Sequence, residues 1–248
     1  MTTLLDAIPS AGLVLPPGFS HRIADGDVHD TACRLAAAGE AEAATLLLGA
    51  RGDRIELAVV LSPDEPLRTA RRAFFAGMVA LADAVGVFGP PEIPVRFLWP
   101  GTVTFNEARL GGGRLGWPDS CPEDAEPDWL VFSAALIASK AASGDPGLTP
   151  DSTALDEEGF PAHLHGPLAE SFARHLTKAF EVWREDGFAR LGARYLARLR
   201  HDPGLSAALD GDGGLRLTHP DGRAECLALS APLLAPAWRD PETGTVRL

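Results

Sequence analysis

Three consecutive glycines inside strand-like sequence constrain this chain more than any other feature. They lie in VRFLWPGTVTFNEARLGGGRLGW, which covers Val95–Trp117. Short segments at Thr102–Phe105 and Arg114–Trp117 flank a polar turn at 106–107, so the pattern predicts a β-hairpin. Glycine loses the most entropy on ordering and packs nothing, so Gly111–Gly113 indicate that another group passes close to the backbone. That group is either a crossing element of the same chain or a bound ligand.

Apolar patterns on both sides of this stretch alternate between strand and helix spacing. Three β-type runs predict strands at 44–50, 55–61 and 129–138. The last run is apolar throughout, which is typical of a strand buried on both faces. Helical spacing predicts helices at 28–38, 66–87, 168–186 and 188–199, the first of them capped from the segment Asp25–Asp27.

The order of these elements predicts an α/β (α+β) fold and three divisions of the chain. Residues 1–24 begin Pro-rich and are expected to be irregular, and 25–200 should form one α/β domain. From about residue 203, short strand patterns alternate with glycine turns. Residues 201–248 should therefore hold a small β module and a tail.

Charge and hydropathy exclude several classes of protein. A formal net charge of −12 argues against binding to nucleic-acid phosphates and to anionic membranes. No apolar run approaches the roughly 20 residues that span a bilayer. The first 17 residues lack the basic and apolar regions of a signal peptide. We therefore expect a cytoplasmic protein.

The cysteines and histidines predict no metal site. Cys33, Cys121 and Cys226 are widely spaced and odd in number, which fits reduced thiols better than disulfides or zinc ligands. His163 and His165 form the one close histidine pair and are expected at the surface. No Walker loop, Rossmann fingerprint or Gly-x-Ser-x-Gly elbow occurs. The residues alone therefore lead to an α/β domain with a glycine-lined hairpin.

Several segments stand in the order and spacing of one known family's motifs. That family carries Lys-Trp-Pro-Asn-Asp, a short hairpin, then a catalytic lysine followed by Leu-Ala-Gly, and this chain has LWPGT at 98–102 and RLGG at 109–112. WLVFSAALIA at 129–138 stands where the family has its Gly-Ile-Gly-Ile-Asn strand, and STALDEEG at 152–159 follows in order. The run at 210–217 is similar to the start of a C-terminal barrel. The chain thus resembles the biotin/lipoate protein ligase family, in its biotin-ligase-like branch.

The resemblance implies a mixed sheet flanked by helices, a small SH3-like module, and a biotin or acyl pocket at the glycine strand. The family's usual reaction uses ATP to convert the carboxylate of biotin, lipoate or octanoate to an acyl-adenylate. The acyl group then passes to a lysine of a biotinyl or lipoyl carrier protein. In this chain the implied ligand-binding residues lie in the hairpin, in the apolar strand 129–138 and between the strands at 44–50 and 55–61. They are Trp99, Pro100, Gly111, Gly112, Gly113, Arg114, Ser133 and Arg51.

The chain departs from the family pattern at the positions that carry its chemistry. The glycine- and arginine-rich adenylate loop should lie between the strands at Leu46 and Ile55, where only GARGDR, 49–54, stands. Arg109 occupies the position of the catalytic lysine. An arginine can hold a carboxylate or phosphate bidentately but cannot lose its proton. The segment before the domain is shorter than the DNA-binding domain of repressor-type ligases, so no nucleic-acid partner is expected.

Two hypotheses of different class follow. In the first, the protein is a divergent ligase or acyltransferase whose predicted catalytic residue, Arg109, clamps the ligand carboxylate. The other interpretation of Arg109 is a surface residue paired with Glu107. In the second, the protein is a non-catalytic relative that binds a small carboxylate or a carrier protein. Acyl transfer through Cys33 or Cys121 is a variant of the first hypothesis, although both thiols are better interpreted as incidental.

Overall fold

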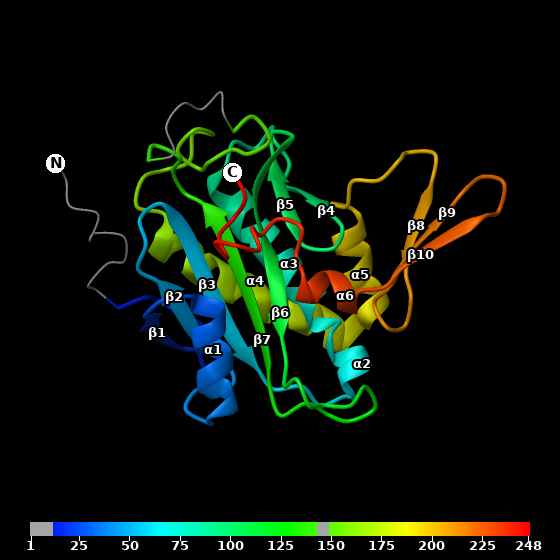
Figure 1. Cartoon of the computed structure of the whole chain (residues 1–248), viewed down its shortest axis with the longest axis horizontal. Coiled ribbons are helices and arrows are strands. Elements are labelled where there is room, and N and C mark those ends of the chain that lie inside the picture. Colours follow the sequence, from blue (N-terminus) through cyan, green and yellow to red (C-terminus); the bar gives the residue numbers. More distant parts are fainter. Residues whose placement is uncertain (1–11, 143–148) are drawn as a thin grey trace.

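A seven-stranded sheet lies at the centre of the computed structural model, which describes residues 12–142 and 149–248 (Figure 1). The strand order is β1-β2-β3-β7-β6-β5-β4. β1 runs parallel to β2, and the other neighbours in this sheet are antiparallel. The mixed sheet implied by the resemblance is therefore confirmed. Its strands are β1 (Ser20–Ala24), β2 (Thr45–Gly49), β3 (Arg54–Leu61), β4 (Arg96–Leu98), β5 (Thr102–Phe105), β6 (Ala108–Gly116) and β7 (Leu130–Ile137).

Helices cover both faces of this sheet. On one face α3 (Ala73–Phe88) packs against β6, β7, α4 (His165–Asp186) and α5 (Phe188–Leu196), and these elements enclose the largest apolar core. On the other face α1 (Val28–Ala37) packs against β3 and β7 (Figure 1). The predicted buried strand is confirmed as β7, because both of its faces are covered.

Local sequence explains where α1 and the long helical segment begin. The side chain of Asp27 accepts a hydrogen bond from the N–H of Asp30 at 2.9 Å, so the predicted cap is confirmed. The predicted helix 66–87 is instead divided into α2 (Leu67–Ala70) and α3. The backbone forms tight turns at the intervening arginines, and Arg71 reaches out to pair with Glu123. The N–H groups of Arg72, Phe74 and Phe75 donate to the carbonyl three residues earlier, so the i→i+4 pattern of an α-helix is interrupted here.

The hairpin forms as predicted, but its second strand is longer. Asn106 and Glu107 make the turn in the left-handed region, with φ of +48° and +67°. β6 then runs from Ala108 to Gly116 through all three glycines. The sequence predicted a strand only from Arg114. Pairing with β5 on one side and β7 on the other keeps the glycines extended.

The two ends of the described chain add to this core. Residues Ser20–Ala24 form the edge strand β1, whereas the sequence predicted irregular chain up to residue 24. The predicted β module is a three-stranded sheet on one side of the molecule (Figure 1), formed by β8 (Ser206–Leu209), β9 (Leu215–Thr218) and β10 (Ala224–Leu227). After α6 (Ser230–Leu234) the chain returns to β6 and β7. The domain boundaries stay a prediction.

No helix in the described ranges is both long and apolar enough to cross a membrane.

Candidate functional site

The space beside the three glycines of β6 is filled by atoms of this chain. A Cβ atom on the first or third glycine would overlap the backbone of β7 or crowd side chains of α3 and β7. A Cβ atom on Gly112 would overlap the indole ring of Trp238, and it would lie 2.5 Å from the carbonyl oxygen of Gly101. Of the two groups that the glycines could admit, the structure therefore contains the crossing element of the same chain.

Residues 236–248, here called the C-terminal strap, hold this indole on the strand. Trp238 is 4% exposed, and its Nε1–H donates to the carbonyl oxygen of Gly113 at 3.1 Å. The neighbouring Arg239 pairs with the carboxylate of Asp27 at 2.8 Å. The strap is therefore tied to the start of α1 and to β6, the strand at which the resemblance implies a ligand.

Arg109 lies between the hairpin and the strap. Its Nε–H donates to the carbonyl oxygen of Arg247 at 3.0 Å, and its backbone pairs with the segment 151–153. Partial burial lowers the pKa of this guanidinium. Glu107, its alternative partner from the sequence, pairs instead with Arg200 at 2.6 Å. One of the five N–H donors of the predicted clamp is thus used by a carbonyl of the chain itself.

The Trp-Pro pair lies in the aromatic core under α3 and α5. The carbonyl oxygen of Pro100 accepts a hydrogen bond from the hydroxyl of Tyr195 at 2.7 Å. The ring of Trp99 lies 6.1 Å from that of Phe75, centroid to centroid. Neither Trp99 nor Pro100 lines a cavity that Arg114 lines. The pair positions the start of β5 and is not brought to the polar residues of β6.

The turn between β2 and β3 holds no room for a phosphate-cradling loop. It consists of residues 50–53, and Arg51 within it is exposed. The Nε2 atom of His165 lies 3.0 Å from the carbonyl oxygen of Arg51, which fixes the turn to the start of α4. With this short turn, and with Trp238 over the glycine strand, the residues present do not fit an acyl-adenylate at the implied position.

Lys140, which is remote from the hairpin in sequence, reaches the same region in space. Its ammonium group is buried, donates to the carbonyl oxygen of Ser152 at 2.7 Å and pairs with Glu157 at 3.0 Å. Ser152 in turn forms a β-bridge with Arg109. Because both contacts tie the 152–157 turn to the end of β7, this lysine acts as a structural tie.

Four polar residues come together on the face of the sheet that α1 covers, here called the α1 face. Arg114 and Ser133 are cross-strand partners in β6 and β7. The hydroxyl oxygen of Ser133 lies 2.7 Å from Nδ1 of His29, and Arg114 pairs with Asp30 at 2.8 Å. Burial first, and then the guanidinium groups of Arg114 and Arg239, hold the pKa of His29 well below its ordinary value. The imidazole is therefore neutral at pH 7.

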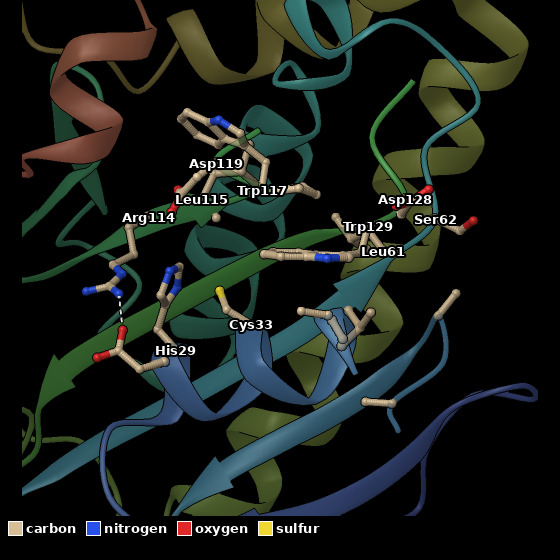
Figure 2. Close-up of a pocket in the computed structure, with 18 of the residues that line it drawn as sticks. His29, Cys33, Leu61, Ser62, Arg114, Leu115, Trp117, Asp119, Asp128 and Trp129 are labelled. Carbon is tan, nitrogen blue, oxygen red and sulfur yellow. Dashed lines mark hydrogen bonds and ion pairs between the residues drawn. The ribbon is translucent and has the colours of Figure 1, made fainter. Parts of the chain in front are cut away.

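An open cavity of about 1060 Å³, here called the α1 cavity, begins at this cluster. In Figure 2, His29 and Cys33 rise from α1 towards Arg114 and Leu115 of β6. A Cβ atom on Gly116 would lie 2.7 Å from Sγ of Cys33 and 2.9 Å from Nε2 of His29, so this glycine makes room for both. The sequence prediction missed His29. The signal was its place four residues before Cys33 on the predicted helix 28–38.

The thiol of Cys33 is not activated. Burial raises the pKa of Cys33 to about 12, against a smaller opposing effect of Arg114. A thiol that stays protonated at neutral pH is a poor nucleophile, so acyl transfer through Cys33 is not favoured. Cys121 lies outside the cluster around His29, in the loop before β7, where its Sγ is 3.6 Å from the carbonyl oxygen of Ala125.

Within the described residues, no group of three or more His, Cys, Asp and Glu side chains is placed to hold a metal ion.

Comparison with known proteins gives matches across most of the chain. The model of the biotin/lipoate A/B protein ligase family matches residues 15–197. A biotin–[acetyl-CoA-carboxylase] ligase of Paracoccus denitrificans is 28% identical over 182 residues, which are 66% of this chain and 74% of that protein.

Solved structures show the same fold. A biotin protein ligase-like protein of unknown function from Silicibacter sp. is 26% identical, with a TM-score of 0.76 over 88% of this chain and 97% of that one. The biotin protein ligase of Aquifex aeolicus, solved in complex with biotin and ATP, is 13% identical, with a TM-score of 0.61 over 86% of this chain and 94% of that one.

Proposed function

The chain belongs to the biotin/lipoate A/B protein ligase family, and we propose that it is a member that binds a small carboxylate without activating it. The observation that carries this proposal is the indole of Trp238 on Gly112, at the strand where the resemblance implies the ligand. Two further features support it. Arg109 replaces the family lysine and donates to the strap, and the turn at 50–53 is too short to cradle a phosphate.

The ligand class follows from the family and from the charge on the α1 face. Biotin, lipoate and octanoate each present one carboxylate on an apolar body. Arg114 and Arg239 both line the α1 cavity, and Arg239 donates to Gly244 and Asp27, whereas Arg114 donates one hydrogen bond within the described residues, to Asp30. Arg109 does not line this cavity, so we assign the ligand to Arg114 in its place. We also propose a cytoplasmic protein, a division into 25–200 and 201–248, and a carrier protein as the partner that presents or receives the ligand.

A second function, ligation of the carboxylate to a carrier lysine, is favoured by the relative from Paracoccus denitrificans, whose name is that of a ligase. It would require the strap to leave β6 and another cation to take over the role of the family lysine. Lys140, which pairs with Glu157, does not supply that cation. We therefore place ligation second.

Calorimetry of the purified protein with biotin, lipoate and octanoate, each with and without ATP and Mg²⁺, tests the proposal. We expect at least one acid to bind, with an affinity that ATP leaves unchanged. If ATP strengthens binding strongly or releases diphosphate, the protein activates its ligand and the proposal is wrong. Failure of all three acids to bind would also contradict it.

A further inference from the structure

We infer that Arg114 holds the ligand carboxylate in the α1 cavity, and that this site accepts a monocarboxylate with an uncharged apolar body while rejecting a second negative charge. The inference rests on the proposed function, because it gives that ligand a position and a chemical class. It moves the anion contact from Arg109, at the start of β6, to Arg114, near its end.

Arg114 has hydrogen-bond donors that the described residues leave unused. Its side chain is 12% exposed, yet among the described residues its guanidinium donates one hydrogen bond, to Asp30, whose own side chain is 68% exposed. A guanidinium carries five N–H donors in a planar fork that matches a carboxylate. Arg114 also lines the α1 cavity, so its unused donors have space for an incoming anion. Asp30 then competes with that anion for the guanidinium.

The walls of the α1 cavity combine small and aromatic side chains. On the α1 side they consist of His29, Asp30, Cys33, Ala36 and Ala37, and the two alanines leave room beside the end of the helix. Trp117 and Trp129 contribute aromatic surface (Figure 2). The guanidinium of Arg71 lies 4.7 Å from the centre of the Trp117 ring. A fixed, partly aromatic wall suits an apolar ligand body.

The loop between Trp117 and Trp129 is fixed by contacts with α2 and with Arg71. Both Nη atoms of Arg71 donate to the carboxylate of Glu123, one of them at 2.9 Å. Leu67 and Arg68 donate backbone hydrogen bonds to carbonyls of the same loop. The α1 cavity therefore exists before any ligand arrives, which lowers the entropic cost of binding.

The outer rim of the α1 cavity is acidic. Glu42, Asp119 and Asp128 line the cavity and are exposed, and none of them has an ion pair within residues 12–142 and 149–248. A ligand whose carboxylate reaches Arg114 would bring its other end towards these groups. A second anionic group there meets like charges, which costs binding energy at low ionic strength. Dicarboxylates, phosphate esters and adenylates are therefore disfavoured.

Calorimetry at low ionic strength with octanoate, octanamide and octanedioate tests both parts of the inference. We expect octanoate to bind at least about tenfold more tightly than octanamide, which lacks the anion, and than octanedioate, which adds a second one. Arg114→Met should weaken octanoate binding at least about tenfold. Arg109→Met, on the same strand, is the matched control and should leave it unchanged. Asp30→Asn should strengthen binding, because the competing carboxylate is gone.

The rim is tested by the combined variant Glu42→Gln, Asp119→Asn and Asp128→Asn, in which octanedioate should approach octanoate in affinity. If octanedioate binds to the wild type as tightly as octanoate, the rim does not reject a second negative charge.

If Arg109→Met loses octanoate binding and Arg114→Met keeps it, Arg114 does not hold the carboxylate, while the proposed function still stands. If octanoate alone fails while biotin or lipoate binds, the same variants are titrated with that acid. If no acid binds to the wild type, the inference and the proposed function fall together. Circular dichroism confirms that each variant is folded.

Discussion

The ring of Trp238 lies directly on Gly112, in the space that any larger residue at that position would need. The contact joins the end of the chain to the middle of its central hairpin. Because the indole also donates to Gly113, the strap is held by both shape and hydrogen bonding. Substitutions on either side of this contact therefore test the arrangement of the site.

Gly112→Ala should lower the free energy of unfolding by about 1–3 kcal/mol, because the added methyl group overlaps Trp238 in a packed region. Urea unfolding measures the change. Gly86→Ala in α3 is the matched control, since a Cβ there meets no atom within 4 Å, and it should be neutral or stabilising by up to about 1 kcal/mol. Equal effects of the two substitutions would show that the strap does not lie on the strand.

Cys33 should react slowly with iodoacetamide at pH 8, because burial raises the pKa of its thiol to about 12. Cys226 is exposed and serves as the internal control. Peptide mapping by mass spectrometry after timed alkylation gives both rates in one experiment. Alkylation of Cys33 as fast as that of Cys226 would revive the hypothesis of a reactive thiol in the α1 cavity.

Stability should fall in mild acid because of His29. Its folded-state pKa lies well below the ordinary value of 6.5, so the unfolded chain binds a proton first as the pH drops. The stabilisation from neutral His29 is present above about pH 6.5 and is lost as the pH falls towards the folded-state pKa. Urea unfolding between pH 7.5 and about pH 5 should show a shallower acid slope for His29→Gln than for the wild type. The exposed His21→Gln serves as control, and a slope unchanged in His29→Gln would contradict the burial of this imidazole.

The wall of the α1 cavity should depend on the guanidinium fork of Arg71. Arg71→Lys keeps the charge but cannot pair bidentately with Glu123 or cover the Trp117 ring in the same way. We expect octanoate to bind about three- to tenfold more weakly to this variant, with little change in secondary structure by circular dichroism. Arg68→Lys, in the preceding helix α2, is the control. Unchanged affinity in Arg71→Lys would mean that the wall does not contact the ligand.

The sequence alone was sufficient to locate the helices and strands that carry strong local patterns. Apolar alternation and run length located β2, β3 and β7, and Asp27 marked the start of α1. The failures have physical causes. Residues 20–24 carry little apolar pattern, because β1 is an exposed edge strand. The division between α2 and α3 lies at a short run of i→i+3 hydrogen bonds around Arg71 and Arg72, and the apolar spacing, which continues across it, does not mark it.

The site was harder to predict, because it depends on long-range contacts. Three glycines indicated a close approach, but nothing near them in sequence indicates that Trp238, 125 residues from Gly113, is the group that approaches. Arg109 was favoured as the clamp for its position beside the glycines, and its bond to the strap could not be inferred from spacing. His29 carried no motif, since its partners lie on β6 and β7.

ATP–diphosphate exchange in the presence of biotin, lipoate or octanoate shows whether this protein activates its ligand. We expect no exchange above the rate without acid, at acid concentrations that calorimetry shows to be saturating. Removal of preorganised charge stabilisation costs about 10²–10³ in rate for each donor lost, and this chain lacks both the loop and the lysine. A biotin ligase of the same family, assayed alongside, shows that the assay detects turnover. Acid-dependent exchange by this protein would contradict the account, because it would mean that the chain forms an acyl-adenylate.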